Sequence, residues 1–288
     1  MAPPEFHMVN GDFFVTEKVR QSFEENGFIL VRGLFDSKEV DKLRKCMEQS
    51  EDIKKNAYGR TDGKGTTSKL CVWNHPGDDV CGVAARTRKV AGTLQHLLGG
   101  WELYHYHSKL MMKEAFTGGA HLWHQDYGYW YQNGCLFPDM GSVFMPVDRC
   151  TRQNSCLQVL AGSHKLGRVN HYNIAGQSGA DLDRVALAKT MCEHVYVEME
   201  PGDALFFHCN VLHTSEQNKS DMRRWVMISS FNQARNNPTK EHHHPCYTHM
   251  DLLPNSAVHH CTNMNSTTDK MFMDPKTDKS AASLQKID

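Results

Sequence analysis

The sequence lacks several features that would place it in a special class of protein. No apolar run approaches the roughly 20 residues that a membrane-spanning helix needs. The formal net charge of −1 provides no overall field to attract nucleic acid or an anionic membrane. Residues 1–7 have no basic and apolar signal region, and residues 285–288 are not the Ser-Lys-Leu peroxisomal address. We therefore expect a cytoplasmic protein without nucleic-acid or membrane partners, and its oligomeric state stays open.

Close cysteine pairs and internal repeats are also missing. The ten cysteines form no C-x-x-C motif, which favours free thiols in a reducing compartment over a disulfide framework. The 288 residues have an ordinary globular composition, with 40% hydrophobic and 23% charged residues. Histidine, with 18 copies, is abundant, so most histidines need an explanation other than metal binding.

The first third of the chain has helical signals around one short strand. Residues 14–27 predict a helix that starts at a Thr16 cap and ends at Gly27, and residues 28–32 predict an apolar strand. A capping-box pattern starts a second helix at 36–47. Residues 52–79 are polar and predict a mobile loop, and residues 87–98 predict a third helix.

The pattern changes after Trp101 to short strands separated by turns. Alternating or apolar segments predict strands at 102–113, 142–148, 195–199, 204–208 and 225–231. Helices followed by a run of short strands indicate an antiparallel barrel on a helical layer.

We expect this organisation to form one domain over residues 1–234. Its helical layer would span residues 14–98, and its barrel core would span residues 101–234. Residues 235–288 are polar and weakly periodic, which predicts a C-terminal extension or lid.

The most informative motif is His124-Gln125-Asp126, followed far downstream by His213. Residues two apart on a strand point to the same side, so His124 and Asp126 can act together. Two imidazoles and one carboxylate suit ferrous iron, because they occupy one face of the metal and leave three positions open. The distant His213 at a strand end completes this candidate set, which predicts a metal centre.

Arginine stands eleven residues after His213, at the expected start of the next strand. The planar guanidinium of Arg224 can pair with a ligand carboxylate through two parallel hydrogen bonds, and Ser215 can add a hydroxyl donor. Arg223 is the alternative anchor. It points to the opposite face, and the spacing favours Arg224.

Other polar residues compete for a role in the site. The structural explanation is preferred for Trp123, Tyr129, His105, His107, His164 and His208, although a barrel-lining role stays open for His105 and His107. The run His242–His244 predicts a solvated surface segment. Lys109 and Lys113 are expected to be solvated, with a cleft-lining role as the alternative.

These residues resemble the phytanoyl-CoA dioxygenase family of Fe(II)- and 2-oxoglutarate-dependent oxygenases. The resemblance covers roughly residues 14–231 and is carried by segments 26–35, 123–126, 154–164 and 201–224. It implies a mainly β fold with helices, a double-stranded β-helix (jelly-roll, cupin-like barrel) flanked by N-terminal helices. It also implies roles for individual residues: His124, Asp126 and His213 as iron ligands, Arg224 as the anchor of 2-oxoglutarate, and Ser215 and Gln125 as further co-substrate contacts.

The resemblance further implies a hydroxylase that uses O2 and 2-oxoglutarate, releases succinate and CO2, and is open to stimulation by ascorbate. An aspartate at position 126 favours hydroxylation, since a halogenating relative would have a small residue there. The polar aromatic segment 127–133 favours a small polar substrate, such as an amino acid, betaine or phosphonate. The alternatives are an acyl-CoA 2-hydroxylase, a non-catalytic barrel that binds metal or metabolite, and a cupin-type enzyme that does not use 2-oxoglutarate.

Overall fold

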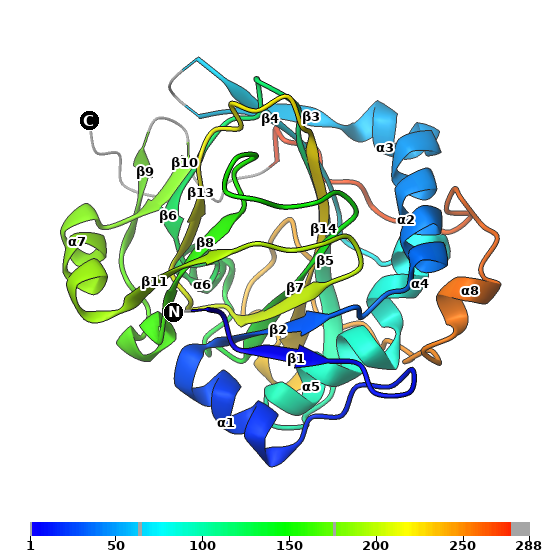
Figure 1. Ribbon diagram of the computed structural model, residues 1–288, viewed down its shortest axis with the longest axis horizontal. Helices are drawn as coiled ribbons and strands as arrows, with labels where there is room; N and C mark the ends of the chain where they lie inside the picture. The colour runs from blue at the N-terminus through cyan, green and yellow to red at the C-terminus, as the bar shows by residue number, and fades with distance from the viewer. Residues whose placement is uncertain (1, 63–64, 175–176, 278–288) are drawn as a thin grey trace.

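Two sheets form the framework of the computed structural model, which describes residues 2–62, 65–174 and 177–277 (Figure 1), and every strand pair except the parallel β1–β2 pair is antiparallel. The major sheet has eight strands in the order β1-β2-β12-β7-β14-β5-β4-β3, and the minor sheet has four in the order β11-β8-β13-β6. A buried apolar cluster joins Phe28 and Leu205 of the major sheet to Val159 and Val195 of the minor sheet, so the two sheets enclose a common interior. The architecture is a double-stranded β-helix, which confirms the predicted fold class.

The strands of both sheets and of the separate β9–β10 pair are short, apart from β5 and β14. They are β1 Glu5–His7, β2 Phe28–Arg32, β3 Tyr58–Thr61, β4 Thr67–Trp73, β5 Leu103–Lys113, β6 His121–His124, β7 Met140–Pro146, β8 Leu157–Ala161, β9 His171–Ile174, β10 Gln177–Ala180, β11 Glu193–Val197, β12 Ala204–His208, β13 His213–Ser215 and β14 Arg224–Gln233. The helices are α1 Glu17–Asn26, α2 Ser37–Gln49, α3 Glu51–Asn56, α4 Val80–Arg86, α5 Thr93–Leu97, α6 Tyr127–Trp130, α7 Leu182–Met191 and α8 Ala257–His260.

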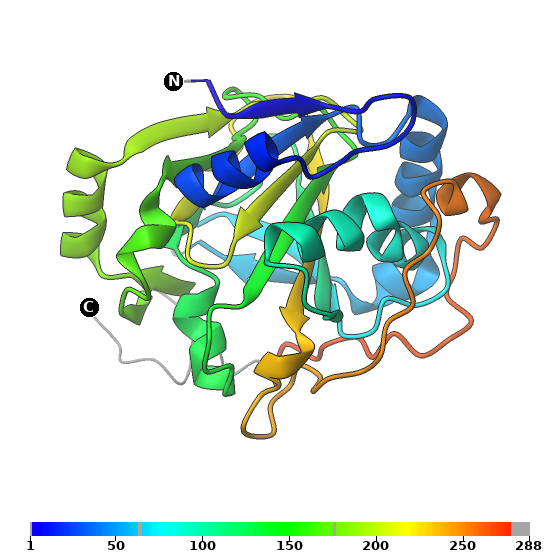
Figure 2. The same ribbon diagram turned by 90° about the horizontal axis from the view of Figure 1, so that it is seen from below.

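Helices cover the outer face of the major sheet, where α1, α2, α4 and α5 form one buried apolar cluster with the strands. In Figure 2 these helices, in blue and cyan, lie across the sheet. The predicted caps of α1 are confirmed, because the Thr16 side chain accepts from the Val19 amide and Gly27 ends the helix at a φ of 79°. A Cβ at Gly27 would lie 2.4 Å from His164 Nδ1, so glycine is required there for close packing as well. The predicted capping box of α2 is also present.

Two helical-layer predictions are wrong in detail. Residues 52–79, predicted as a mobile loop, contain α3, β3 and β4, and β4 pairs with β5 inside the major sheet. The reason is the apolar run Leu70–Trp73, which is buried against both faces of the sheet and outweighs the polar residues around it. The predicted helix at 87–98 is a π-helical turn at Arg88–Gly92 followed by α5.

The polar C-terminal region packs against the rest of the protein. Its described part, residues 235–277, runs back along the helical layer, and Trp73 bridges to Phe272 in β fashion. The Lys270 ammonium lies 2.6 Å from the Asp79 carboxylate, and both side chains are 1% exposed. A buried ion pair of this kind ties the segment to the N-terminal end of α4. Residues 278–288 of the predicted extension lie outside the described residues.

His105 links the fold to a measurable pH dependence. Its ring is buried, its Nδ1 lies 2.9 Å from the Asn74 carbonyl oxygen, and its Nε2 lies 2.7 Å from Ser108 Oγ. Burial lowers the pKa of His105 to about 3. The unfolded chain therefore binds this proton more tightly than the folded chain does. The resulting stability is fully present above the ordinary pKa of about 6.5 and is lost as the pH falls towards 3.

We expect His105 alone to reduce the free energy of unfolding by about 2 kcal/mol between pH 7 and pH 5. Urea unfolding of the wild type and of His105→Gln at both pH values measures this term, because the glutamine does not titrate. The variant should lose less stability than the wild type over the same interval. Equal losses in the two proteins would show that the buried imidazole does not control this pH dependence.

Candidate active site

Three predicted ligands meet where the minor sheet ends. His124 is the last residue of β6, His213 is the first residue of β13, and the two pair directly in the sheet. Their Nε2 atoms lie 3.7 and 3.9 Å from Asp126 Oδ1, and their ring centroids are 4.1 Å apart. The expected convergence is therefore present. One detail differs from the prediction that His124 and Asp126 lie on one strand. Asp126 lies beyond the end of β6, has helical backbone angles and is the N-cap residue of α6. The turn into α6, rather than strand alternation, directs its carboxylate towards the two imidazoles.

Hydrogen bonds orient each of the three side chains. His124 Nδ1 lies 2.7 Å from the Leu122 carbonyl oxygen, and His213 Nδ1 lies 2.9 Å from that of Val211. Each carbonyl accepts the Nδ1 proton, which leaves the Nε2 lone pair directed at the shared space. Tyr129 Oη donates to Asp126 Oδ1 at 2.8 Å. Burial lowers the pKa of both histidines, so both are held neutral, as metal ligands must be. The donor set and its geometry fit ferrous iron.

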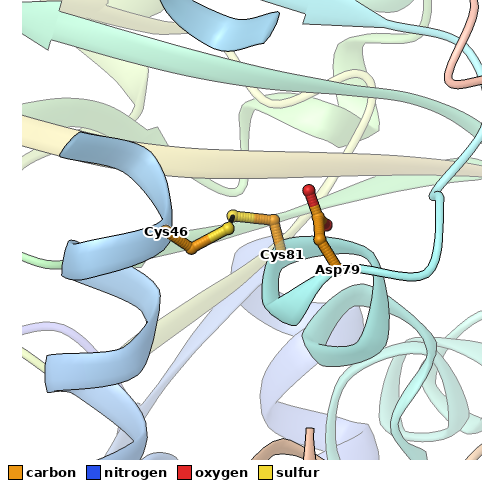
Figure 3. Close-up of side chains that lie close together, drawn as sticks. All are labelled: Cys46, Asp79 and Cys81. Carbon is orange, nitrogen blue, oxygen red and sulfur yellow. Dashed lines mark hydrogen bonds between the residues drawn. The ribbon is translucent and has the colours of Figure 1, made fainter. Parts of the chain in front are cut away.

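A second group of possible ligands lies in the helical layer, where Cys46 of α2 meets Cys81 of α4 beside Asp79 (Figure 3). The two sulfurs are 3.7 Å apart, and Asp79 accepts from the Gly82 amide while pairing with Lys270. The Lys270 ammonium already neutralises the one carboxylate, and burial with the thiol–thiol contact raises the pKa of Cys81 well above its usual value. We assign this cluster to the packing of the core.

Arg224 lies inside the barrel, at the first position of β14, and pairs in register with Lys113 of β5. Its side chain is 1% exposed, and Nε and Nη1 have no hydrogen-bond partner among the described residues. Lys113 is fully buried and donates to Ser155 Oγ at 3.2 Å and to the Glu216 carbonyl oxygen. The expectation that Lys113 is solvated is therefore wrong, because the sheet turns it inward. Two buried cations side by side are costly unless a dianionic ligand joins them.

Arg223, the alternative anchor, points the other way. It pairs with Glu48 of α2 and lies 2.9 Å from Asp148, on the outer face of the sheet. Its guanidinium also stacks over the Trp225 ring at 4.6 Å. With its donors used outside the barrel, Arg223 does not face the interior, whereas Arg224 is buried there.

Ser215 and Gln125 lie close to the triad of His124, Asp126 and His213 in sequence but on different sides of the chain. Ser215 is buried on β13 two residues after His213, and the pairing of β13 with β6 is irregular between the two positions. Gln125 instead faces the loops behind the strand. Its amide nitrogen donates to the carbonyls of Gly167 and Asn210, and its oxygen accepts from the Val169 amide. Both N–H groups are thus used, so we replace the predicted co-substrate contact of Gln125 with a role in holding these loops.

A pocket of about 700 Å³, including its open mouth, leads to His124. Its walls come from β3, β4, β5, β6, β10, the residue Tyr129 of α6 and the C-terminal segment. They are formed by Tyr58, Arg60, Leu70, Val72, His107, Lys109, His121, His124, Tyr129, Gln177, Ser178, His243, His244 and Met273. Arg224 and Lys113 are not among these residues. The pocket therefore reaches His124 without including the buried Arg224 and Lys113 in its wall.

The histidine run His242–His244 takes part in this wall, which corrects its prediction as a solvated surface segment. His244 is 8% exposed, its Nδ1 lies 3.0 Å from Asn74 Oδ1, and its ring stacks on His107 with centroids 4.4 Å apart. His107 thus has the barrel-lining role that was left open. His105 faces away, on the side that packs against Asn74 and Phe231.

Sequence reasoning missed Arg60 and His121 as pocket residues. Alternation along β5 places His107, Lys109, Met111 and Lys113 on one face, and this period of two was the available signal for the lysines. No comparable local signal existed for Arg60, since the strand that carries it lies in the region predicted as a loop.

The fold and the site together define a double-stranded β-helix with a His-x-Asp…His ligand set and a buried arginine beyond it. The chain belongs to the phytanoyl-CoA dioxygenase (PhyH) family, whose sequence model matches residues 23–226.

Named relatives share most of the chain. It is 28% identical to L-proline trans-4-hydroxylase of Streptomyces griseoviridis over 255 residues, covering 82% of this chain and 93% of the relative. It is 26% identical to ectoine dioxygenase of Bordetella parapertussis over 239 residues, covering 76% and 77%.

The fold is shared with solved structures at lower identity. The iron-bound crystal structure of EctD from S. alaskensis has a TM-score of 0.69 at 20% identity and covers 88% of this chain and 95% of its own. The non-heme alpha-ketoglutarate-dependent carbocyclase SnoK from nogalamycin biosynthesis has a TM-score of 0.63 at 16% identity, covering 92% and 98%. In the part of the chain that the structure describes, no helix is long and apolar enough to span a bilayer.

Proposed function

We propose that this protein is an Fe(II)- and 2-oxoglutarate-dependent dioxygenase that hydroxylates a C–H bond of a small polar metabolite and releases succinate and CO2. The observation that carries the proposal is the convergence of His124, Asp126 and His213 at the end of a pocket, with the buried Arg224 in the same barrel. The relatives named for proline hydroxylation and ectoine dioxygenation support it.

Separate groups of residues would bind the metal and the co-substrate. His124, Asp126 and His213 would hold iron on one face. Arg224 would receive the far carboxylate of 2-oxoglutarate through two parallel hydrogen bonds, with Lys113 beside it and the Ser215 hydroxyl as a further donor. Bound iron with 2-oxoglutarate supplies the oxidation by O2. The chain's contribution is to position one C–H bond and to keep the site enclosed.

Features of the pocket weigh against the other functions. Its polar and imidazole-rich wall, with Leu70, Val72 and Met273 as its apolar part, suits a small amino acid, betaine or phosphonate better than a long acyl chain. A cupin-type enzyme without 2-oxoglutarate would have no use for a buried arginine whose Nε and Nη1 lack partners. The cytoplasmic location and the absence of nucleic-acid partners stay predictions from charge and composition.

The direct test is succinate formation under air with Fe(II), 2-oxoglutarate and ascorbate, first without substrate and then with a panel of amino acids, betaines, phosphonates and acyl-CoAs. We expect slow succinate release without substrate and faster release with one of the small polar compounds. The control is the same protein with the metal removed by a chelator. Succinate no higher than in this control, with every compound tested, would contradict the proposed function and favour a non-catalytic binding barrel.

A further inference from the structure

The pocket carries two cations that the co-substrate does not require. Arg60 of β3 and Lys109 of β5 both line it, and among the described residues that do so none is Asp or Glu. In the proposed function, the metal and Arg224 would already neutralise the two carboxylates of 2-oxoglutarate. Iron, Asp126, 2-oxoglutarate and Arg224 would together carry no net charge, even before the buried Lys113 beside Arg224 is counted. Arg60 and Lys109 place two further cationic side chains on the wall of the pocket that contains His124.

Lys109 is directed into the barrel beside the triad. It is half-buried on a strand whose other residues are buried, and alternation places it on the inner face with His107, Met111 and Lys113. Lys109 lines the pocket together with His107, His121, His124 and His244, within reach of a molecule that enters it.

Arg60 borders the same space from the other side. It stands two strands from Lys109, with β4 between them, and its charge also lowers the pKa of His121. Val72 of β4 pairs in register with Lys109, and the small apolar surface of Leu70 and Val72 separates the two cations along the wall. A guanidinium and an ammonium beside a small apolar surface suit a ligand that has one carboxylate and a small hydrocarbon group.

The imidazoles around this place are neutral hydrogen-bonding groups. His107 Nδ1 and His121 Nδ1 are buried and have no hydrogen-bond partner among the described residues. Buried polar atoms are normally paired, so these two nitrogens are available to a ligand that enters the pocket. They supply further contacts for a polar substrate without adding negative charge to the wall.

We propose that Arg60 and Lys109 bind the carboxylate of the substrate, so that the enzyme acts on small carboxylic acids, zwitterions included, and not on molecules that lack a carboxylate. This inference rests on the proposed function and gives it a substrate class. Arg60 and Lys109 would set substrate specificity from the wall of the pocket.

Matched pairs of probes test the proposal. L-proline, glycine betaine and ectoine each carry a carboxylate, and their carboxamides, such as L-prolinamide, have nearly the same shape without the charge. Calorimetry without oxygen, in the presence of Fe(II) and 2-oxoglutarate, measures binding. Succinate release under air measures turnover. We expect at least one carboxylate to bind and to stimulate succinate release, and its carboxamide to bind at least about tenfold more weakly.

Variants connect this preference to the two residues. Lys109→Met should weaken binding of the active carboxylate by about ten- to a hundred-fold and abolish the preference for it over the carboxamide, while Lys109→Arg should keep much of both. Arg60→Met should act in the same direction. Lys69→Met is the matched control, because Lys69 lies on the adjacent β4 with an exposed side chain, and it should leave both measurements unchanged.

The outcomes separate this inference from the proposed function. The inference alone would be overturned if the protein forms succinate without substrate but one of three binding results is found. These results are that no carboxylate binds, that carboxylate and carboxamide bind equally, or that Lys109→Met binds the carboxylate as the wild type does. Absence of succinate would overturn the proposed function, and calorimetry would still decide whether Arg60 and Lys109 bind a carboxylate.

Discussion

Asp126→Ala is expected to reduce succinate formation to the level of the chelator-treated protein, both with and without substrate. The substitution removes the anionic member of the three-residue ligand set, and it removes the acceptor that holds Tyr129 Oη at 2.8 Å. His124 and His213 remain, and since imidazole alone binds iron, metal binding should weaken without disappearing. Succinate assays and metal titration of the same preparations therefore give different results, which distinguishes a lost reaction from a lost fold.

A histidine outside the site provides the control for this experiment. His208 ends β12 beside His164, with ring centroids 5.6 Å apart, and its Nδ1 accepts from the Asn210 amide. His208→Asn should keep wild-type succinate formation, as expected of a packed residue. If Asp126→Ala forms more succinate than the chelator-treated protein, Asp126 is not an essential metal ligand. If the wild type forms no more succinate than Asp126→Ala, a non-catalytic binding barrel is favoured.

Arg224→Lys is expected to raise the 2-oxoglutarate concentration needed for half-maximal activity by about ten- to a hundred-fold. The lysine keeps the positive charge but replaces a planar pair of donors with a single point charge. Iron affinity should change little, because Arg224 is not in the ligand set. Arg223→Lys is a matched control on the neighbouring position, since Arg223 pairs with Glu48 and Asp148 outside the barrel. Equal 2-oxoglutarate affinities in wild type and Arg224→Lys would move the anchor elsewhere.

The stability of an Arg224→Met variant adds an independent measurement. A guanidinium that is buried without partners on Nε and Nη1 beside Lys113 destabilises the protein when the co-substrate is absent. Methionine at this position should therefore leave the melting temperature unchanged or higher, and it should abolish the increase that 2-oxoglutarate produces in the wild type. A variant that melts lower yet keeps the 2-oxoglutarate response would contradict the role of Arg224.

Local signals in the sequence were sufficient wherever neighbours along the chain determine the structure. Thr16, Gly27 and Asp36 begin or end their helices as predicted, because a cap depends on the backbone within one turn. The alternation of β5 and the apolar run at 28–32 were likewise readable. The spacing from His124 and Asp126 to His213 was enough to predict the three side chains that the structure brings together, and their roles and that of Arg224 stay predictions.

The tertiary structure decided the features that depend on pairing between distant segments. Strand β4 forms in a polar region because β5 supplies its hydrogen bonds, and the same pairing brings Arg60 to the pocket. His244 enters the wall because the C-terminal segment returns to the barrel and stacks it on His107.

Side-chain direction at neighbouring positions was decided in the same way. Gln125 points to the loops at 167–169 and 210 while its neighbours point to the metal site, because the chain leaves β6 at that point. Lys113 is buried because β14 places Arg224 beside it inside the barrel. The sequence alone determined which residues are chemically able to form the site. Only long-range packing determined which of them face it, because burial depends on partners that lie tens to hundreds of residues away.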